Sequence, residues 1–232
     1  MKRRLKVNGV IIFVICLLLL IFPVAFFRNG QNIQYSLVRD VFGIAFILLG
    51  QLFRASGRGF KSDNSGSGHF LIQSGPYAFV RNPMYLGIFL IGLGIIVTLF
   101  KWWALIIFLL VFAIRYIVLI VTEEKKLQAM FAPDYLNYQQ RVPRVIPSIT
   151  KILKTDISAY LPLRISWLNR EVGSILAVLF LVVILKFWQG MQNQSLDACL
   201  MEITAIIITV SLFLTITVYL IKKTERDVSS KG

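Results

Sequence analysis

The sequence has little charge, only two cysteines and a single histidine. Charged residues make up 16% of the 232 residues, whereas an average soluble domain contains about 25%. Two cysteines cannot form the disulfide framework of a small secreted protein, so that class is excluded. The histidine, His69, lies in a glycine-rich loop, where a side chain is more often solvated than catalytic. We predict no metal site.

Apolar residues are abundant instead. They make up 57% of the chain, and the mean hydropathy is +0.74, which excludes a disordered basic tail because disorder requires low hydropathy. The formal net charge of +14 arises from 25 Lys and Arg against 11 Asp and Glu. In so apolar a chain, this excess of basic residues indicates orientation in a lipid bilayer rather than binding of nucleic acid.

Six apolar stretches predict an all-α, polytopic membrane protein. A spanning helix needs roughly 20 mostly apolar residues. The predicted spans are residues 10–27, 35–53, 84–100, 102–121, 172–188 and 203–221. The third and fourth are separated only by Lys101, so we expect them to form an antiparallel hairpin. The second span contains Arg39 and Asp40 in its first turns, and these side chains must pair or reach the membrane surface.

The basic residues predict that both termini are cytoplasmic. In that orientation 20 of the 25 Lys and Arg residues lie on the cytoplasmic side, as the positive-inside rule requires. We interpret residues 1–27 as a retained anchor rather than a cleaved signal, because the apolar run is long and no small-x-small cleavage site follows it. The pattern predicts neither the particular membrane nor the oligomeric state.

We divide the chain into three parts: two N-terminal membrane helices over residues 1–53, a core over 54–170, and a C-terminal helix pair with a basic tail over 171–232. The core contains two cytoplasmic segments, 54–83 and 122–170. The first includes the run SDNSGSG and is expected to begin as a flexible loop. The second is expected to open with an amphipathic helix at the membrane surface, interrupted at Pro133 and ended by Pro143 and Pro147.

The segment GPYAFVRNPMYLG, residues 75–87, joins the first cytoplasmic segment to the third span. Asn82 and Pro83 form a favourable helix start, with Asn82 as N-cap and Pro83 at the first helical position. A helix N-terminus with Arg81 beside it suits a carboxylate or phosphate ligand. The alternative interpretation is that Asn82 only caps the helix and Arg81 reaches lipid headgroups.

Two further pairs of residues and one arginine are candidate functional residues. Gly92 and Gly94 lie in the third span about 200° apart around the helix, so close helix packing is one explanation for them. Glu123 and Glu124 follow the fourth span directly, where they can bind a cationic group or pair with neighbouring basic residues. Arg115 lies inside the fourth span and is interpreted as the partner of an acidic group.

Taken in order, these motifs resemble a known superfamily. The sequence contains L-I-x-S-G-P-Y-x-x-V-R-N-P-M-Y-L-G, a glycine-bearing hairpin, E-E-x-x-L, and then Y-x-x-Y-x-x-x-V-P-R-x-I-P. This arrangement resembles the integral-membrane methyltransferases, which include the isoprenylcysteine carboxyl methyltransferases and the phospholipid N-methyltransferases. The resemblance covers about residues 71–147.

The resemblance implies that S-adenosylmethionine binds in a cytoplasm-facing pocket between the hairpin and the segment after it. The residues implied for cofactor binding are Arg81, Pro83, Tyr85, Gly92, Gly94, Glu123, Glu124, Tyr135, Tyr138 and Arg144. Arg81, Asn82 and Glu124 are implied for catalysis. Asn82 stands where histidine is commoner in the superfamily; its amide can replace a hydrogen bond but cannot act as a base near neutral pH.

The chemistry of the cofactor agrees with this assignment. Arg81 is expected to bind its carboxylate, and Glu123 or Glu124 its ammonium group, so glutamine at either acidic position should weaken binding with little loss of folded protein. The acceptor is a lipid or another membrane-partitioned molecule, either a carboxylate, which needs no base, or an amine, which does. Two alternatives remain: an NADPH-dependent membrane reductase of the sterol-reductase type, and a non-enzymatic membrane scaffold.

Overall fold

The computed structural model describes residues 23–27, 33–65, 70–147, 160–193 and 196–229. Regular structure in these ranges is helical, apart from an isolated bridge between Phe27 and Phe100, which confirms the predicted all-α class. The helices are α2 (Pro23–Phe26), α3 (Ile33–Asn64), α4 (Pro76–Phe79), α5 (Pro83–Leu99), α6 (Trp102–Phe131), α7 (Asp134–Arg141), α10 (Ile165–Asn193) and α11 (Leu196–Ser229). The predicted first span, up to residue 22, lies outside the described residues, as do Cys16 and His69.

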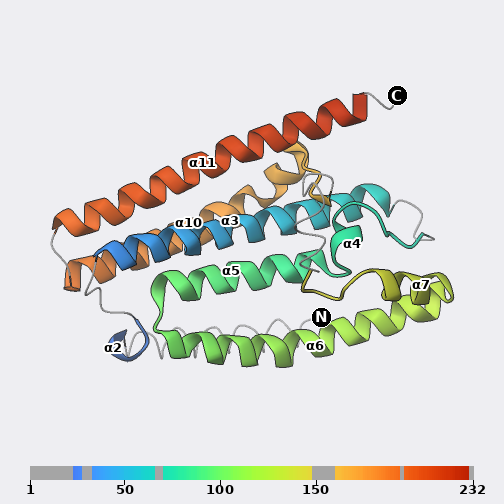
Figure 1. Cartoon of the computed structure of the whole chain (residues 1–232), viewed down its shortest axis with the longest axis horizontal. Coiled ribbons are helices and arrows are strands. Elements are labelled where there is room, and N and C mark those ends of the chain that lie inside the picture. Colours follow the sequence, from blue (N-terminus) through green and yellow to red (C-terminus); the bar gives the residue numbers. More distant parts are fainter. Residues whose placement is uncertain (1–22, 28–32, 66–69, 148–159, 194–195, 230–232) are drawn as a thin grey trace.

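The long helices lie side by side in one bundle (Figure 1). Helices α11 and α6 form opposite edges of the view, with α3, α10 and α5 between them. Four described helices are long and apolar enough to cross a membrane, namely α3, α6, α10 and α11, and α5 is a shorter apolar helix. The chain is therefore a polytopic integral membrane protein. We call the end where α3 finishes and α5 begins the loop end, and the other the opposite end.

Glycines bring α3 and α5 into close contact. A Cβ atom on Gly94 would lie 2.4 Å from the carbonyl oxygen of Gly43, and one on Gly50 would lie 2.5 Å from that of Gly87. Small residues at such positions allow two membrane helices to pack backbone against backbone. Gly94 therefore has the packing role that was one explanation for it.

A buried group of charged residues joins α3 to the C-terminal helices at the opposite end. The Lys186 ammonium lies 2.8 Å from Asp40 Oδ2 and 3.0 Å from Glu202 Oε2. The Ser36 hydroxyl donates a hydrogen bond to Glu202, and Arg39 lies 4.0 Å from Asp40. The expectation that Asp40 must be paired is confirmed, since a charge that is fully buried within a bundle requires a partner.

The prediction that the segment 54–83 begins as a loop is wrong, because α3 continues as a helix to Asn64. Contacts with α10 explain the extension. Arg54 and Arg58 both donate hydrogen bonds to Glu171, which is 2% exposed. Gly59 lies so close to Trp167 that a Cβ atom there would be 2.2 Å from the indole ring. Tertiary packing thus overrides the low helix propensity of the glycines in this stretch.

The helical hairpin is as predicted, with α5 and α6 joined at Lys101. The amphipathic helix expected after the fourth span is not separate from it: α6 runs without interruption to Phe131, and α7 follows after the break at Pro133. The two domain boundaries proposed from the sequence, at residues 53/54 and 170/171, fall inside α3 and α10.

Candidate functional site

A pocket of about 270 Å³ opens at the loop end of the bundle. It is formed by the end of α3, the chain before and after α4, the end of α6, and α7. Its walls are made by Lys61, Ser65, Phe70, Leu71, Ile72, Tyr77, Arg81, Asn82, Glu123, Glu124, Leu127, Met130, Phe131, Tyr135 and Tyr138. Six of the residues predicted for the site therefore come together here, although α7 is far in sequence from the α4–α5 region.

Glu124 forms ion pairs with two arginines, Arg81 and Arg144. It is 6% exposed, and its carboxylate accepts two hydrogen bonds from the Arg144 guanidinium, from Nε at 3.1 Å and from Nη2 at 2.8 Å. Arg81 Nη1 lies 3.0 Å from Glu124 Oε1, the oxygen that also accepts from Arg144 Nε. A forked arginine–carboxylate pair is directional and strong. Glu124 thus links α6 to the chain segments that precede α5 and follow α7.

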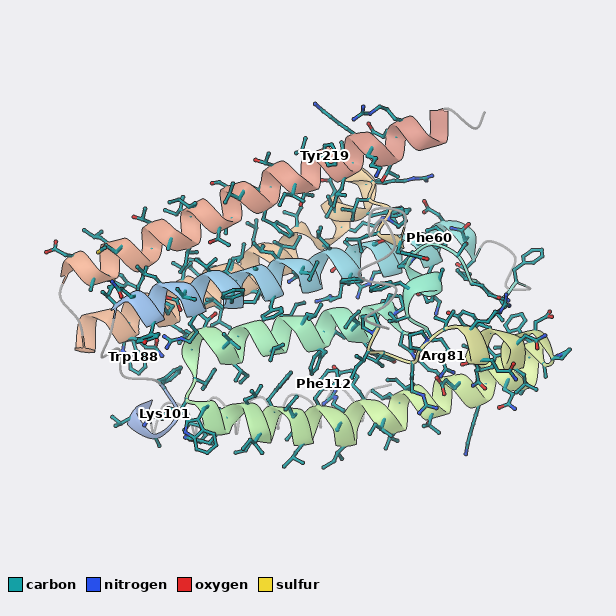
Figure 2. The ribbon with its side chains drawn as sticks, in the orientation of Figure 1. Phe60, Arg81, Lys101, Phe112, Trp188 and Tyr219 are labelled. Atoms are coloured by element: carbon teal, nitrogen blue, oxygen red, sulfur yellow. The ribbon has the colours of Figure 1, made fainter. Side chains whose placement is uncertain are left out.

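Arg81 has buried N–H groups without a hydrogen-bond acceptor among the described residues. Its Nε and Nη1 atoms are buried and have no hydrogen-bond partner among the described residues, because the 3.0 Å ion pair with Glu124 lacks hydrogen-bond alignment. Buried N–H groups without a partner cost free energy, so they are uncommon in folded proteins. Arg81 lies at the loop end, in the wall of the pocket (Figure 2). It is therefore suited to an anionic ligand group.

Glu123 differs from its neighbour. It is exposed, lines the pocket, and accepts a hydrogen bond of 2.9 Å from the neutral hydroxyl of Tyr85. Because this hydroxyl carries no charge, the contact does not neutralise the carboxylate of Glu123. Tyr85 itself does not line the pocket; it lies in the first turn of α5 and contacts the lining residue Glu123.

Asn82 occupies the N-cap position of α5, and Pro83 follows it at the start of the helix, as predicted. However, the Asn82 side chain does not cap the helix, so that part of the prediction is wrong. Its Nδ2 and backbone N–H both donate to the carbonyl oxygen of Arg144, at 3.0 and 3.1 Å. The Arg81 N–H donates to Pro143 O at 2.9 Å. Because these carbonyls lie alongside, the amide is used to hold two distant chain segments together.

Tyrosines close the other side of the pocket. Tyr135 and Tyr138 are 1% and 3% exposed, and the Tyr138 hydroxyl donates to Tyr77 O at 2.6 Å. The Tyr77 hydroxyl donates in turn to Gly57 O on α3 at 3.3 Å. Burial raises the pKa of both the Tyr77 and Tyr138 hydroxyls far above the ordinary value, and the negative charge of Glu123 raises that of Tyr77 further. Both hydroxyls are therefore neutral donors at physiological pH.

The pocket does not include every predicted residue. Gly92 and Gly94 lie outside it; Gly94 faces α3, and a Cβ atom on Gly92 would lie 2.4 Å from the Phe108 ring of α6. Pro83 is buried beside Gly57, and Arg115 is exposed on α6. The predicted cofactor contacts of the two glycines, and the acidic partner of Arg115, stay predictions.

The sequence reasoning did not select several residues of the pocket wall. Tyr77 stands within the quoted motif, three residues after Ser74, and was overlooked there. Lys61 and Ser65 reach the pocket only because α3 extends to Asn64, and no local pattern predicted that extension. Phe70, Leu71 and Ile72 supply an apolar wall from the segment before α4.

The fold and the pocket define a class: a polytopic α-helical membrane protein with a charged pocket at one end of its bundle. Residues 31–134, from just before α3 to the first residue of α7, match the family model described as phospholipid methyltransferase. The superfamily resemblance predicted from the motifs is thereby confirmed. Helices α10 and α11 lie outside the matched region.

Three curated relatives are named protein-S-isoprenylcysteine O-methyltransferase, one of them as form B. The chain is 33% identical over 114 residues to that of Schizosaccharomyces pombe, an alignment that covers 46% of this chain and 48% of the relative. It is 32% identical over 134 residues to that of Saccharomyces cerevisiae, covering 53% and 56%. It is 30% identical over 116 residues to form B of Arabidopsis thaliana, covering 47% and 59%. The chain thus spans about half the length of these relatives. No solved structure matches it significantly.

Proposed function

We propose that the protein is an S-adenosylmethionine-dependent methyltransferase that acts on a lipid-linked or other membrane-partitioned acceptor. The observation that carries the proposal is the presence of opposite charges in one pocket: the guanidinium of Arg81, whose buried Nε has no hydrogen-bond partner among the described residues, and the exposed carboxylate of Glu123. The likeness to membrane methyltransferases over α3 to α6 supports it.

The residues present fit the cofactor. Its amino acid moiety carries one carboxylate and one ammonium group, which match Arg81 and Glu123 respectively. Leu127, Met130 and Phe131 provide apolar surface for the remainder. The pocket volume of 270 Å³ is just below the roughly 300–1,000 Å³ of small-molecule sites. When bound, S-adenosylmethionine supplies an electrophilic methyl group on a sulfonium centre.

The other polar residues of the pocket would hold this arrangement. Glu124 fixes the guanidinium of Arg81 and, through Arg144, the chain after α7. Tyr77 and Tyr138 tie α3, α4 and α7 together as neutral donors. Because a methyl transfer to an ionised acceptor depends largely on in-line positioning and exclusion of water, rigid walls are the main contribution of the protein.

We propose that the acceptor group is a carboxylate. The relatives named above are O-methyltransferases of isoprenylcysteine, which supports a carboxylate on a prenylated group. A carboxylate needs no base, and Asn82, the residue in the place of the commoner histidine, cannot provide one. Lys61 adds a second cation to the lining of the pocket, which also contains Arg81. We further propose that the loop end faces the cytoplasm, as the distribution of basic residues indicates.

The first test is calorimetric titration of the detergent-purified protein with S-adenosylmethionine, S-adenosylhomocysteine and NADPH. We expect the first two to bind, and we expect Arg81→Ala and Glu123→Gln to weaken that binding. Lys125→Gln is the matched control, since Lys125 is an exposed neighbour outside the pocket. Binding of NADPH alone would favour a membrane reductase, and binding of none would favour a scaffold.

The second test concerns the acceptor. Radiolabelled methyl transfer is measured with a farnesylated cysteine that has a free carboxylate, and with phosphatidylethanolamine as the amine lipid. We expect label in the carboxylate acceptor, released by base as expected for a methyl ester. Label in the amine lipid alone would refute the carboxylate proposal and leave the methyltransferase class intact.

A further inference from the structure

We propose that the first turns of α10, centred on Trp167, position the walls of the pocket, so that this end of the C-terminal helix pair supports ligand binding and the pair is more than an appended anchor. This inference rests on the proposed function. Neither α10 nor α11 lines the pocket; α11 forms the edge of the bundle opposite α6, and α10 crosses α3 in the view (Figure 1). Their influence must therefore pass through the elements that do line it.

The first route runs through the end of α3. The Trp167 Nε1–H donates to Asp63 Oδ2 at 3.0 Å, and Arg164 Nη1 donates to the same oxygen at 2.9 Å. Asp63 stands between Lys61 and Ser65 in the chain, and these two line the pocket. Trp167 is 3% exposed, which means that the indole is a fixed part of the core.

Close packing reinforces this contact. The backbone of Gly59 lies against the indole so tightly that a Cβ atom would be 2.2 Å from its ring carbons. Arg170 Nη1 lies 3.3 Å from Ser62 Oγ, one turn further along α10. The last two turns of α3 thus contact the start of α10 through Gly59, Ser62 and Asp63. The orientation of Lys61 and Ser65 depends on these contacts.

The second route runs through the chain around α4. The Phe60 ring meets the Trp167 ring edge to face, with centroids 6.4 Å apart. On its other side Phe60 contacts Gly75, whose φ of +57° requires glycine and where a Cβ atom would lie 2.8 Å from the Phe60 ring. Gly75 precedes α4, which presents Tyr77 to the pocket. Phe60 and Arg81 lie at the same end of the bundle (Figure 2).

Residues 76–82 accordingly have two faces. Tyr77 and Arg81 face the pocket, while Phe79 and Val80, at 3% and 0% exposed, face a core shared with the C-terminal helices. That core contains Leu161, Leu163 and Ile221. Since Val80 directly precedes Arg81, a shift in this core moves the guanidinium proposed to bind the ligand. A binding group displaced by about 1 Å loses much of its effect.

The test compares Trp167→Phe with Val182→Ala in the full-length protein. Trp167→Phe removes the N–H donor to Asp63 and keeps an aromatic ring. Val182 is also fully buried on α10, but in a core with Ile44 and Leu48, away from the pocket. The readouts are amide hydrogen exchange without any cofactor and calorimetric binding of S-adenosylhomocysteine. Thermal unfolding of both variants provides the matched measure of stability.

We expect Trp167→Phe to accelerate exchange at the amides of Arg81 and Asn82 and to raise the Kd for S-adenosylhomocysteine about 3- to 10-fold, the range expected for one lost hydrogen bond. Val182→Ala should change neither, although it lowers the unfolding temperature. Asp63→Ala, which removes the oxygen that accepts the Trp167 Nε1–H, should weaken binding similarly, and the double variant should add little, because both changes remove the same contact.

The inference would be overturned if Trp167→Phe and Val182→Ala showed equal exchange rates at Arg81 and Asn82 and equal Kd values for S-adenosylhomocysteine. If Trp167→Phe fails to fold, Asp63→Ala at a side chain that is 33% exposed carries the same comparison, because it removes the acceptor of the same hydrogen bond. If the unaltered protein does not bind S-adenosylhomocysteine, the proposed function fails; a difference in exchange between the two variants would then still support the positioning role of Trp167.

Discussion

Replacing Glu124 by glutamine tests the central ion pair of the pocket. The carboxylate accepts two hydrogen bonds from Arg144 and lies 3.0 Å from Arg81. Glutamine keeps the size of the side chain but removes the charge, and its amide nitrogen cannot accept a hydrogen bond. One arginine nitrogen therefore loses its acceptor, and the Arg81 side chain, which is 11% exposed, remains charged without a counter-ion.

The magnitude follows from the burial of the three groups. Breaking a fully buried pair costs about 3–5 kcal/mol. The Arg144 side chain is 51% exposed, so solvent screens its half of the pair. We therefore expect Glu124→Gln to lower the free energy of unfolding by about 2 kcal/mol, close to the loss of a charge-assisted hydrogen bond. For a chain of this size, that change lowers the unfolding temperature by about 4–8 °C.

The assay is thermal unfolding in detergent, with Glu123→Gln as the comparison. Glu123 is exposed and accepts its hydrogen bond from the neutral hydroxyl of Tyr85, so its replacement should leave the unfolding temperature nearly unchanged. The sequence alone led us to expect that both variants would fold normally, and the structure restricts that expectation to Glu123. Equal unfolding temperatures for the two variants would refute the conclusion that the ion pairs of Glu124 with Arg81 and Arg144 stabilise the fold.

Three further perturbations test other parts of the molecule. Gly94→Ala should destabilise the protein by about 1–3 kcal/mol because its Cβ meets the backbone of α3, whereas Gly173→Ala, with nothing within 4 Å, should be neutral or slightly stabilising in the same unfolding assay. Lys186→Met should cost about 3–5 kcal/mol and reduce the yield of folded protein, because it leaves two buried carboxylates without their ammonium partner; an unchanged yield and unfolding temperature would contradict this. The raised pKa of Tyr77 contributes stability that is complete below about pH 10 and is lost as the pH rises above that value, because only the unfolded state then releases the proton; Tyr77→Phe should make the unfolding temperature fall less steeply above pH 10.

The sequence was sufficient to predict the features that depend on composition and short-range order. Apolar length predicts the helical hairpin, since α5 and α6 lie on either side of Lys101 as expected. Hydropathy could not fix where the helices end, because their ends are set by contacts with distant segments. The extension of α3 to Asn64 depends on Glu171 and Trp167, more than a hundred residues away.

The pocket was predictable in its charged residues and unpredictable in their pairing. Arg81 and Glu124 were selected for their residue types and their place at the end of a span, and both lie in the pocket wall. Arg144 donates two hydrogen bonds to Glu124, and Asn82 donates one to the Arg144 carbonyl. Both contacts depend on the path of the chain after α7. A residue pattern does not encode that path, because ion pairs are formed by tertiary proximity.

The adjacent residues Glu123 and Glu124 have different surroundings on the same helix, and we therefore assign them different roles. Neighbours in an α-helix point about 100° apart, so they cannot face the same surroundings. On α6 this rotation directs Glu124 into the protein, where two guanidinium groups neutralise it, and leaves Glu123 exposed beside a neutral hydroxyl. The proposed ammonium site therefore belongs to Glu123, and Glu124 contributes by holding Arg81. Under this division Glu123→Gln should weaken binding of S-adenosylhomocysteine at constant stability, and Glu124→Gln should lower both together.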